Sequence, residues 1–240
     1  MRIDEYIKAE GLAASRSRAK LLIEEGSVTV NGTLVTKASY EVREGDRVNV
    51  SDLPYVSRGG LKLAAALAAF SLSPQGCVAL DVGASSGGFT DCLLQKGASF
   101  VYAVDSGRGQ MAPSLLRDPR VVCREGYNAR YMQASDFEKT PTFAVMDVSF
   151  ISQTLILPAL AALLPSGANL VSLIKPQFEV GRAHIGRGGI VRDEKAREAA
   201  VTRVQEVALS LGLVPKGVIT SPIRGGDGNV EYLAHFVKGE

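Results

Sequence analysis

The sequence lacks tryptophan and has only two histidines and three cysteines among its 240 residues. The cysteines, Cys77, Cys92 and Cys123, are odd in number and do not have the paired spacing of metal ligands. This pattern argues against a disulfide framework and against a zinc site. We therefore expect no bound metal and a reducing compartment, the cytoplasm.

A secretion signal and a membrane span are missing as well. The start, MRIDEYIKAEG, has acidic residues in its first turns and no apolar segment, which is not typical of a signal peptide. The most apolar stretch, LILPALAALLP at 155–165, contains two prolines and is far shorter than the roughly 20 apolar residues that cross a bilayer. We expect no membrane partner.

A large excess of one charge is also absent, because the net charge is only +2. The bulk charge therefore neither requires nor excludes a nucleic-acid partner. Hydrophobic residues make up 46% and charged residues 22%, which is ordinary for a globular protein. A chain of this length can form one medium domain and one small domain.

Residues 1–51 predict a small α+β domain of two helices followed by a sheet. Gly11 and Gly26 are placed to end the helices, and Ser15 is a good N-cap for the second. Alternating residues around Asn31-Gly32 predict a hairpin, and DRVNV adds a strand. We place a linker at 52–59 and a second domain at 60–240.

Three basic residues, Arg16, Arg18 and Lys20, begin the second helix with no acid among them. Positive charge at a helix N-terminus opposes the helix dipole, so helix stability does not explain the cluster. Phosphate binding would explain it, and a solvated polar face is the alternative.

The segment RIDEYIKAEGLAASRSRAKLLIEEGSVTVNG, together with DRVNV, resembles the S4-type RNA-binding module. This resemblance implies that the second helix and the hairpin present a basic surface to structured RNA. Such a surface suits RNA duplexes, which are recognised largely by shape and phosphate geometry.

In residues 60–240, apolar strands alternate with helical patterns, which predicts a doubly wound, Rossmann-like α/β domain. Its first glycine-rich turn reads Asp81-Val-Gly83-Ala-Ser85-Ser-Gly87-Gly88. A dinucleotide site would have glycine where Ser85 stands, and Asp81 would repel a pyrophosphate. A cationic ligand without phosphate, such as S-adenosylmethionine, fits the turn better.

A second acid, Asp105, ends the next strand, where a carboxylate can accept hydrogen bonds from ribose hydroxyls. NAD enzymes share such an acid, so Asp105 alone does not separate the two classes. From its spacing, Phe89 either packs beside the adenosine or belongs to ordinary helix packing.

Four polar residues stand in apolar surroundings: Lys62, Asp147, Lys175 and Glu231. Asp147 and Lys175 follow strands, and Glu231 would begin a final antiparallel strand at the same edge of the sheet, where ligands bind in such folds. A lysine whose pKa is lowered by burial and a nearby cation can take a proton from a ribose hydroxyl. The alternative is four separate, solvated or ion-paired residues.

The motifs SRGGLKL, LDVGASSGGFTD, VYAVDSGRGQ, MDVSF, LIKPQFE and GNVEYL resemble the FtsJ-like 2′-O-ribose methyltransferases, and the chain as a whole resembles the TlyA family, often labelled haemolysin A. This resemblance implies S-adenosylmethionine-dependent methylation of cytidine in ribosomal RNA. It implies Lys62, Asp147, Lys175 and Glu231 as a catalytic tetrad, with Lys175 as the proton acceptor. Gly87, Phe89, Asp105 and Asp147 would contact the cofactor. Either Glu125 or Asn128 would lie near the adenine.

A glycine-rich, basic loop at 178–195 follows Lys175 and carries Arg182, His184, Arg187 and Arg192. We interpret it as a mobile lid that contacts RNA, in particular through Arg182 and Arg187. A flexible surface loop is the alternative.

Two other functions remain to be tested against this interpretation. A membrane-lytic protein would match the haemolysin label, although the sequence has no evident lytic helix. An RNA-binding factor with an inactive methyltransferase fold would bind RNA but not the cofactor.

Overall fold

The computed structural model describes residues 1–24, 26–50 and 54–240. The chain divides into two compact units, Met1–Arg58 and Gly59–Glu240. Residue 51, the predicted end of the first domain, and residues 52 and 53 of the predicted linker lie outside the described residues, and the predicted domain boundaries stay a prediction.

The first unit has the predicted α+β form. Asn31 and Gly32 both have positive φ, 51° and 78°, as a tight hairpin turn requires. The Ser15 hydroxyl accepts the Arg18 N–H at 3.1 Å, which confirms the N-cap. The elements are α1 (Ile3–Ala9), α2 (Arg16–Glu24), β1 (Val28–Val30), β2 (Thr33–Leu34) and β3 (Val48–Val50), and the strands form an antiparallel sheet in the order β2-β1-β3.

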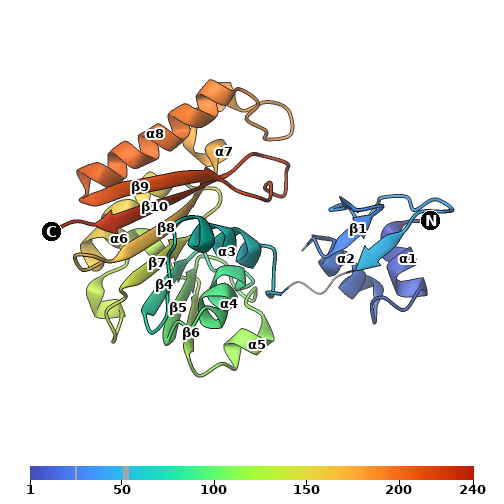
Figure 1. Ribbon diagram of the computed structural model, residues 1–240, viewed down its shortest axis with the longest axis horizontal. Coiled ribbons are helices and arrows are strands. Elements are labelled where there is room, and N and C mark those ends of the chain that lie inside the picture. Colours follow the sequence, from blue (N-terminus) through green and yellow to red (C-terminus); the bar gives the residue numbers. More distant parts are fainter. Residues whose placement is uncertain (25, 51–53) are drawn as a thin grey trace. The chain divides into compact units, whose positions relative to one another are not determined.

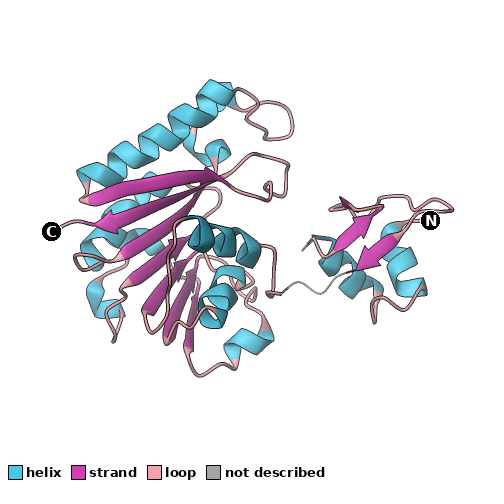
Figure 2. Cartoon of the chain, in the orientation of Figure 1, coloured by secondary structure: helices cyan, strands magenta, loops and turns pink. Residues whose placement is uncertain are grey.

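The second unit is built on a seven-stranded sheet in the order β6-β5-β4-β7-β8-β10-β9 (Figures 1 and 2). Among these described strands, β10 alone runs in the opposite direction to the others, and it pairs antiparallel with β8 and β9. The strands are β4 (Val78–Val82), β5 (Phe100–Asp105), β6 (Val121–Glu125), β7 (Phe143–Met146), β8 (Asn169–Ile174), β9 (Leu213–Thr220) and β10 (Tyr232–Lys238).

Helices cover both faces of this sheet. Figure 1 shows α3 and α4 in front of the strands and α6 behind them. Along β4, Leu80 and Val82 belong to the core that includes α6 and α8, whereas Asp81 faces Thr90 of α4. The helices are α3 (Gly59–Ala69), α4 (Gly88–Gln95), α5 (Pro113–Leu116), α6 (Leu157–Leu163), α7 (Pro176–Glu179) and α8 (Glu194–Ser210), and the Asp193 side chain caps α8.

The predicted fold class, a doubly wound α/β domain with a small α+β domain before it, is confirmed. Strand order reverses between β4 and β7, since β5 and β6 lie on one side of β4 and β7 and β8 on the other. In folds of this kind, ligands bind at the carboxyl ends of the strands beside such a reversal. Among the described residues, no helix combines the length and the apolar composition needed to cross a membrane.

Candidate active site

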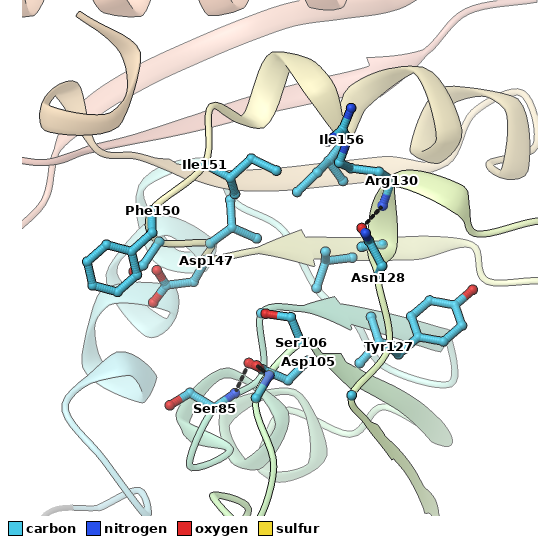
Figure 3. Close-up of a pocket in the computed structure, with 18 of the residues that line it drawn as sticks. Ser85, Asp105, Ser106, Tyr127, Asn128, Arg130, Asp147, Phe150, Ile151 and Ile156 are labelled. Carbon is cyan, nitrogen blue, oxygen red and sulfur yellow. Dashed lines mark hydrogen bonds between the residues drawn. The ribbon is translucent and has the colours of Figure 1, made fainter. Parts of the chain in front are cut away.

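A cavity of about 750 Å³ lies at this reversal point. Its walls come from the segments that follow β4, β5, β6 and β7, and Figure 3 shows Ser85, Asp105, Asn128 and Asp147 around it. The cavity is therefore formed by side chains from four neighbouring strand ends.

The glycine turn after β4 packs directly against the end of β7. Gly83 has φ +86°, and a Cβ on it would lie 2.3 Å from the Asp147 carbonyl oxygen. A larger residue would push these strand ends apart. Of the predicted cofactor residues in this turn, Gly83 and Ser85 line the cavity, whereas Gly87 and Gly88 are buried at the start of α4.

Asp105 lines the cavity and organises its lower wall (Figure 3). Its carboxylate accepts the Ser85 N–H at 2.8 Å and the Gly107 N–H at 2.6 Å. The Ser85 hydroxyl also donates to Gln110 Oε1 at 2.9 Å. Asp105 thus joins the first two turns of the domain at the position predicted for ribose contacts.

Asp81 is fully buried beneath the glycine turn. Thr90 Oγ1 donates to Asp81 Oδ2 at 2.7 Å, while Asp81 Oδ1 has no hydrogen-bond partner among the described residues. Burial, and then the nearby charges of Asp147 and Asp105, raise the pKa of Asp81 to about 7. A cation that reached Oδ1 would satisfy this carboxylate.

Two residues considered in the sequence analysis, Phe89 and Glu125, are not among the described residues that line the cavity. The Phe89 side chain is 3% exposed in α4 and does not line the cavity in the described part of the chain, which favours ordinary packing over stacking on an adenosine. Glu125 accepts the backbone N–H groups of residues 109–111, which lowers the pKa of its carboxyl group. Since Asn128 lines the cavity, it is the better placed of the two candidates for the adenine.

The four predicted catalytic side chains form two ion pairs. Lys62 Nζ lies 2.6 Å from Glu231 Oε2, and both side chains are nearly buried. Lys175 Nζ lies 2.5 Å from Asp147 Oδ1 and also donates to Ser149 Oγ at 2.8 Å.

Sheet register explains how residues so distant in sequence meet. Tyr232 pairs with Ile174, so Glu231 and Lys175 come next to each other at the end of the β8–β10 ladder. Met146 of β7 pairs with Ser172 of β8, which brings Asp147 to the same edge. Lys62 reaches this edge from α3, which packs against β10.

Phe150 is a residue that sequence reasoning missed. Its side chain is 93% exposed, it lines the cavity, and its φ of 65° is unusual for a bulky residue. Figure 3 shows it beside Asp147 at the cavity. The motif MDVSF was noted for Asp147 only, and an aromatic residue after a strand carries no signal of exposure.

The predicted RNA-binding residues fall into two groups. Arg16 Nε lies 2.7 Å from Asp4 Oδ2 and Arg16 Nη1 lies 3.0 Å from Glu5 Oε1, so its charge is used within the first unit. The other four, Arg18, Lys20, Arg182 and Arg187, are exposed.

The loop that carries Arg182 and Arg187 is attached to the fold near the tetrad. The buried side chain of Asn229 accepts the Val191 N–H and donates to the Gly189 carbonyl, both at 2.9 Å. Two residues further on is Glu231. The mobility that we expected for this loop stays a prediction.

A doubly wound sheet with an antiparallel β10, and a cavity at the reversal point that Asp105 and Asp147 line, is typical of Rossmann-like methyltransferases, and solved methyltransferase structures share this fold. The chain belongs to the FtsJ-like methyltransferase family, whose model matches residues 55–238, and residues 1–48 match the S4 domain. The resemblances of the sequence to the S4 module and to the FtsJ-like methyltransferases are thereby confirmed.

Three relatives illustrate how far the similarity extends. The 16S/23S rRNA (cytidine-2'-O)-methyltransferase TlyA of Mycobacterium tuberculosis is 43% identical over 97% of this chain and 88% of its own. Hemolysin A of Brachyspira hyodysenteriae is 43% identical over 99% of this chain and all of its own. A solved structure described as "Putative hemolysin from Streptococcus thermophilus" is 46% identical, with a TM-score of 0.80 over 100% of this chain and 89% of that one.

Proposed function

We propose that this protein is an S-adenosylmethionine-dependent methyltransferase that modifies the 2′-hydroxyl of a cytidine in ribosomal RNA. The observation that carries the proposal is the Lys175–Asp147 pair at the edge of the cavity, in a chain of the FtsJ-like family. The name of the mycobacterial relative supplies the ribosomal RNA and the cytidine.

The residues around the cavity fit this cofactor. The charges of Asp147 and Asp105 contribute to the raised pKa of Asp81, and three carboxylates in one region disfavour a pyrophosphate and favour a cation. Asp81 Oδ1 would accept from the ammonium group, Asp105 from the ribose hydroxyls, and Asn128 would lie at the adenine. The bound cofactor supplies an activated methyl group on a sulfonium centre.

The protein's own side chains act on the ribose. In its neutral form, Lys175 Nζ accepts the proton of the 2′-hydroxyl and becomes the ammonium that pairs with Asp147, while Ser149 also holds this nitrogen in place. Glu231 holds Lys62 beside the same oxygen, where its ammonium balances the developing negative charge. Alignment of the oxygen with the methyl group accounts for much of the rate.

Binding of the RNA is divided among several surfaces. The S4 domain docks structured RNA through the exposed Arg18 and Lys20. Near the cavity, exposed Phe150 offers a ring on which an unpaired base can stack. An enzyme that modifies ribosomal RNA acts where ribosomes are assembled, and we therefore assign it to the cytoplasm.

The test is mass mapping of ribose methylation in ribosomal RNA from cells with and without the protein, together with transfer of labelled methyl groups to ribosomal subunits in vitro. We expect one or more cytidines to lose methylation in the deletion strain. Cofactor binding by calorimetry separates this function from an inactive RNA-binding factor. Lysis of red cells by the purified protein, without any methyl transfer, would favour the membrane-lytic alternative.

A further inference from the structure

A buried polar network centred on Glu179 joins the two chain segments that carry Lys175 and Asp147. The Glu179 side chain is 5% exposed, and both of its oxygens are occupied. Ser152 Oγ donates to Oε2 at 2.5 Å, and the Gln153 N–H donates to Oε1 at 2.9 Å. Burial of a carboxylate costs free energy. The presence of buried Glu179, with a donor on each oxygen, therefore calls for a structural reason.

The network joins the two segments that carry the partners of the ion pair. Glu179 ends α7, the short helix that Lys175 begins as its N-cap. Ser152 and Gln153 end the segment after β7 that carries Asp147 and Ser149, the two groups that contact Lys175 Nζ. The same two segments are therefore connected twice, once through the contacts of Lys175 Nζ and once through the hydrogen bonds of Glu179.

Gln153 extends the connection into the sheet. Its buried side chain accepts the Ser172 hydroxyl and donates to the Leu173 carbonyl at 3.2 Å, both in β8. On the other side, Arg203 of α8 donates to the Glu179 carbonyl oxygen at 3.4 Å. Because both ends are fixed to regular elements, the network can transmit the rigidity of the sheet to the cleft.

We propose that Glu179 is a positioning residue, which holds the segment 147–153 against α7 so that Asp147 and Ser149 keep Lys175 Nζ at the reacting oxygen. This inference rests on the proposed function. It assigns the effect to the two hydrogen bonds of Glu179 and not to its negative charge.

Two substitutions separate these possibilities. Glu179→Ala removes both acceptors, and we expect kcat to fall by about 100-fold, the cost of a misplacement near 1 Å. Glu179→Gln keeps both hydrogen bonds but reverses one of them: its oxygen accepts the Gln153 N–H, and its amide donates to Ser152 Oγ, whose hydroxyl can turn to Thr154 Oγ1 at 2.7 Å. We expect Glu179→Gln to keep kcat within about threefold of the wild-type value.

The measurement is kcat and KM for methyl transfer, with the Kd of S-adenosylhomocysteine from calorimetry. We expect the Kd to change by less than about threefold in either variant, since most of the cavity lies on other segments. Asn169→Ala is the matched control, because it breaks the 2.9 Å bond between Asn169 and His235 at the opposite end of β8. It should lower stability and leave kcat unchanged.

Three results would overturn the proposal. The first is wild-type kcat in Glu179→Ala, which would make the network a matter of stability alone. The second is a loss in Glu179→Gln as large as in Glu179→Ala, which would assign the effect to charge. The third is unchanged hydrogen exchange of residues 147–154 in Glu179→Ala. This measurement needs no activity, so it tests whether Glu179 holds segment 147–153 even if the wild-type protein methylates nothing. If Glu179→Ala does not fold, Ser152→Ala, which removes one bond, should lower kcat less but in the same direction.

Discussion

Among the described residues, each unit of the protein buries one aspartate completely, and the surroundings of these two aspartates have opposite effects on their pKa values. Asp4 of the first unit accepts from Arg2 Nε at 3.0 Å and from Arg16 Nε at 2.7 Å. Burial alone would raise the pKa of Asp4, but these two hydrogen bonds outweigh it and lower the pKa to about 2. Asp81 of the second unit has one threonine partner, and its pKa is raised to about 7.

This difference separates a structural charge from one that awaits a ligand. The arginines satisfy Asp4 inside its own unit, so nothing further is needed for that carboxylate to remain ionised. Asp81 keeps an oxygen without a hydrogen-bond partner among the described residues, and its chain neighbours Val82 and Gly83 line the cavity. The first unit therefore uses buried charge to fix its fold, and the second retains it for binding and chemistry.

The largest effect that follows is on catalysis. Lys175→Ala should lower methyl transfer to ribosomal subunits by roughly 1,000-fold, the order of a lost proton acceptor, without unfolding the second unit. The exposed Lys216→Ala is the control and should keep wild-type activity. If Lys175→Ala transfers methyl groups as fast as the wild-type protein, the Lys175–Asp147 pair is structural. The two units would then not differ in how they use charged residues.

A reciprocal pair of substitutions tests the aspartates themselves. Asp81→Asn should raise the Kd of S-adenosylmethionine by about 10- to 100-fold, the worth of a hydrogen bond to a charged group, without loss of stability. Asp4→Asn should leave that Kd unchanged and destabilise the first unit by about 2 kcal/mol. Calorimetry and hydrogen exchange of residues 1–24 measure the two effects, and the same pattern in both variants would contradict the comparison.

The pH dependence sharpens the contrast. The ionised form of Asp81 binds the ammonium group, so affinity for S-adenosylhomocysteine should rise about tenfold from pH 6 to pH 8, through the pKa near 7. Without ligand, the raised pKa means that the folded protein keeps a proton which the unfolded chain releases. The contribution of Asp81 to stability therefore falls as pH rises from about 4 to 7.

Asp4 has the opposite sign, because its folded-state pKa is lowered. Its contribution to stability is complete above about pH 4 and is lost as the pH falls through about 2. The first unit should therefore show no change from this group between pH 6 and 8. If the affinity of Asp81→Asn for S-adenosylhomocysteine rises from pH 6 to pH 8 as much as that of the wild-type protein, the group that titrates is not Asp81.

Sequence patterns predicted those parts of the site that follow from local order. Glycine turns, strand ends and the antiparallel last strand place Asp105, Asp147, Lys175 and Glu231 at one edge, and each signal lies within a few residues of its element. The hairpin at Asn31 was predictable for the same reason, since the turn type is encoded in two residues.

Properties set by tertiary packing were not predictable in this way. Helical spacing cannot decide whether Phe89 faces a ligand or the core, and its burial came from the packing of α4. Glu125 has the sequence context of a ligand contact, yet three backbone N–H groups from a neighbouring loop occupy it. The hydrogen bond from Arg16 to Asp4 forms because α1 and α2 pack together, and no local sequence pattern predicts this packing.

The smallest expected effects concern the basic residues of α2, and they extend the comparison to charges on the surface. Arg18→Ala and Lys20→Ala should each weaken RNA binding about threefold and lower the salt slope of binding by about one, with no loss of stability, because both side chains are exposed. Arg16→Ala should instead destabilise the first unit, since it leaves buried Asp4 with one arginine. Filter binding to a ribosomal RNA fragment at several salt concentrations gives the slopes, and hydrogen exchange of α1 gives the stability. Equal salt slopes of RNA binding and equal hydrogen-exchange protection of α1 in all three variants would contradict this prediction. They would show that Arg16 does not differ from Arg18 and Lys20 in its role.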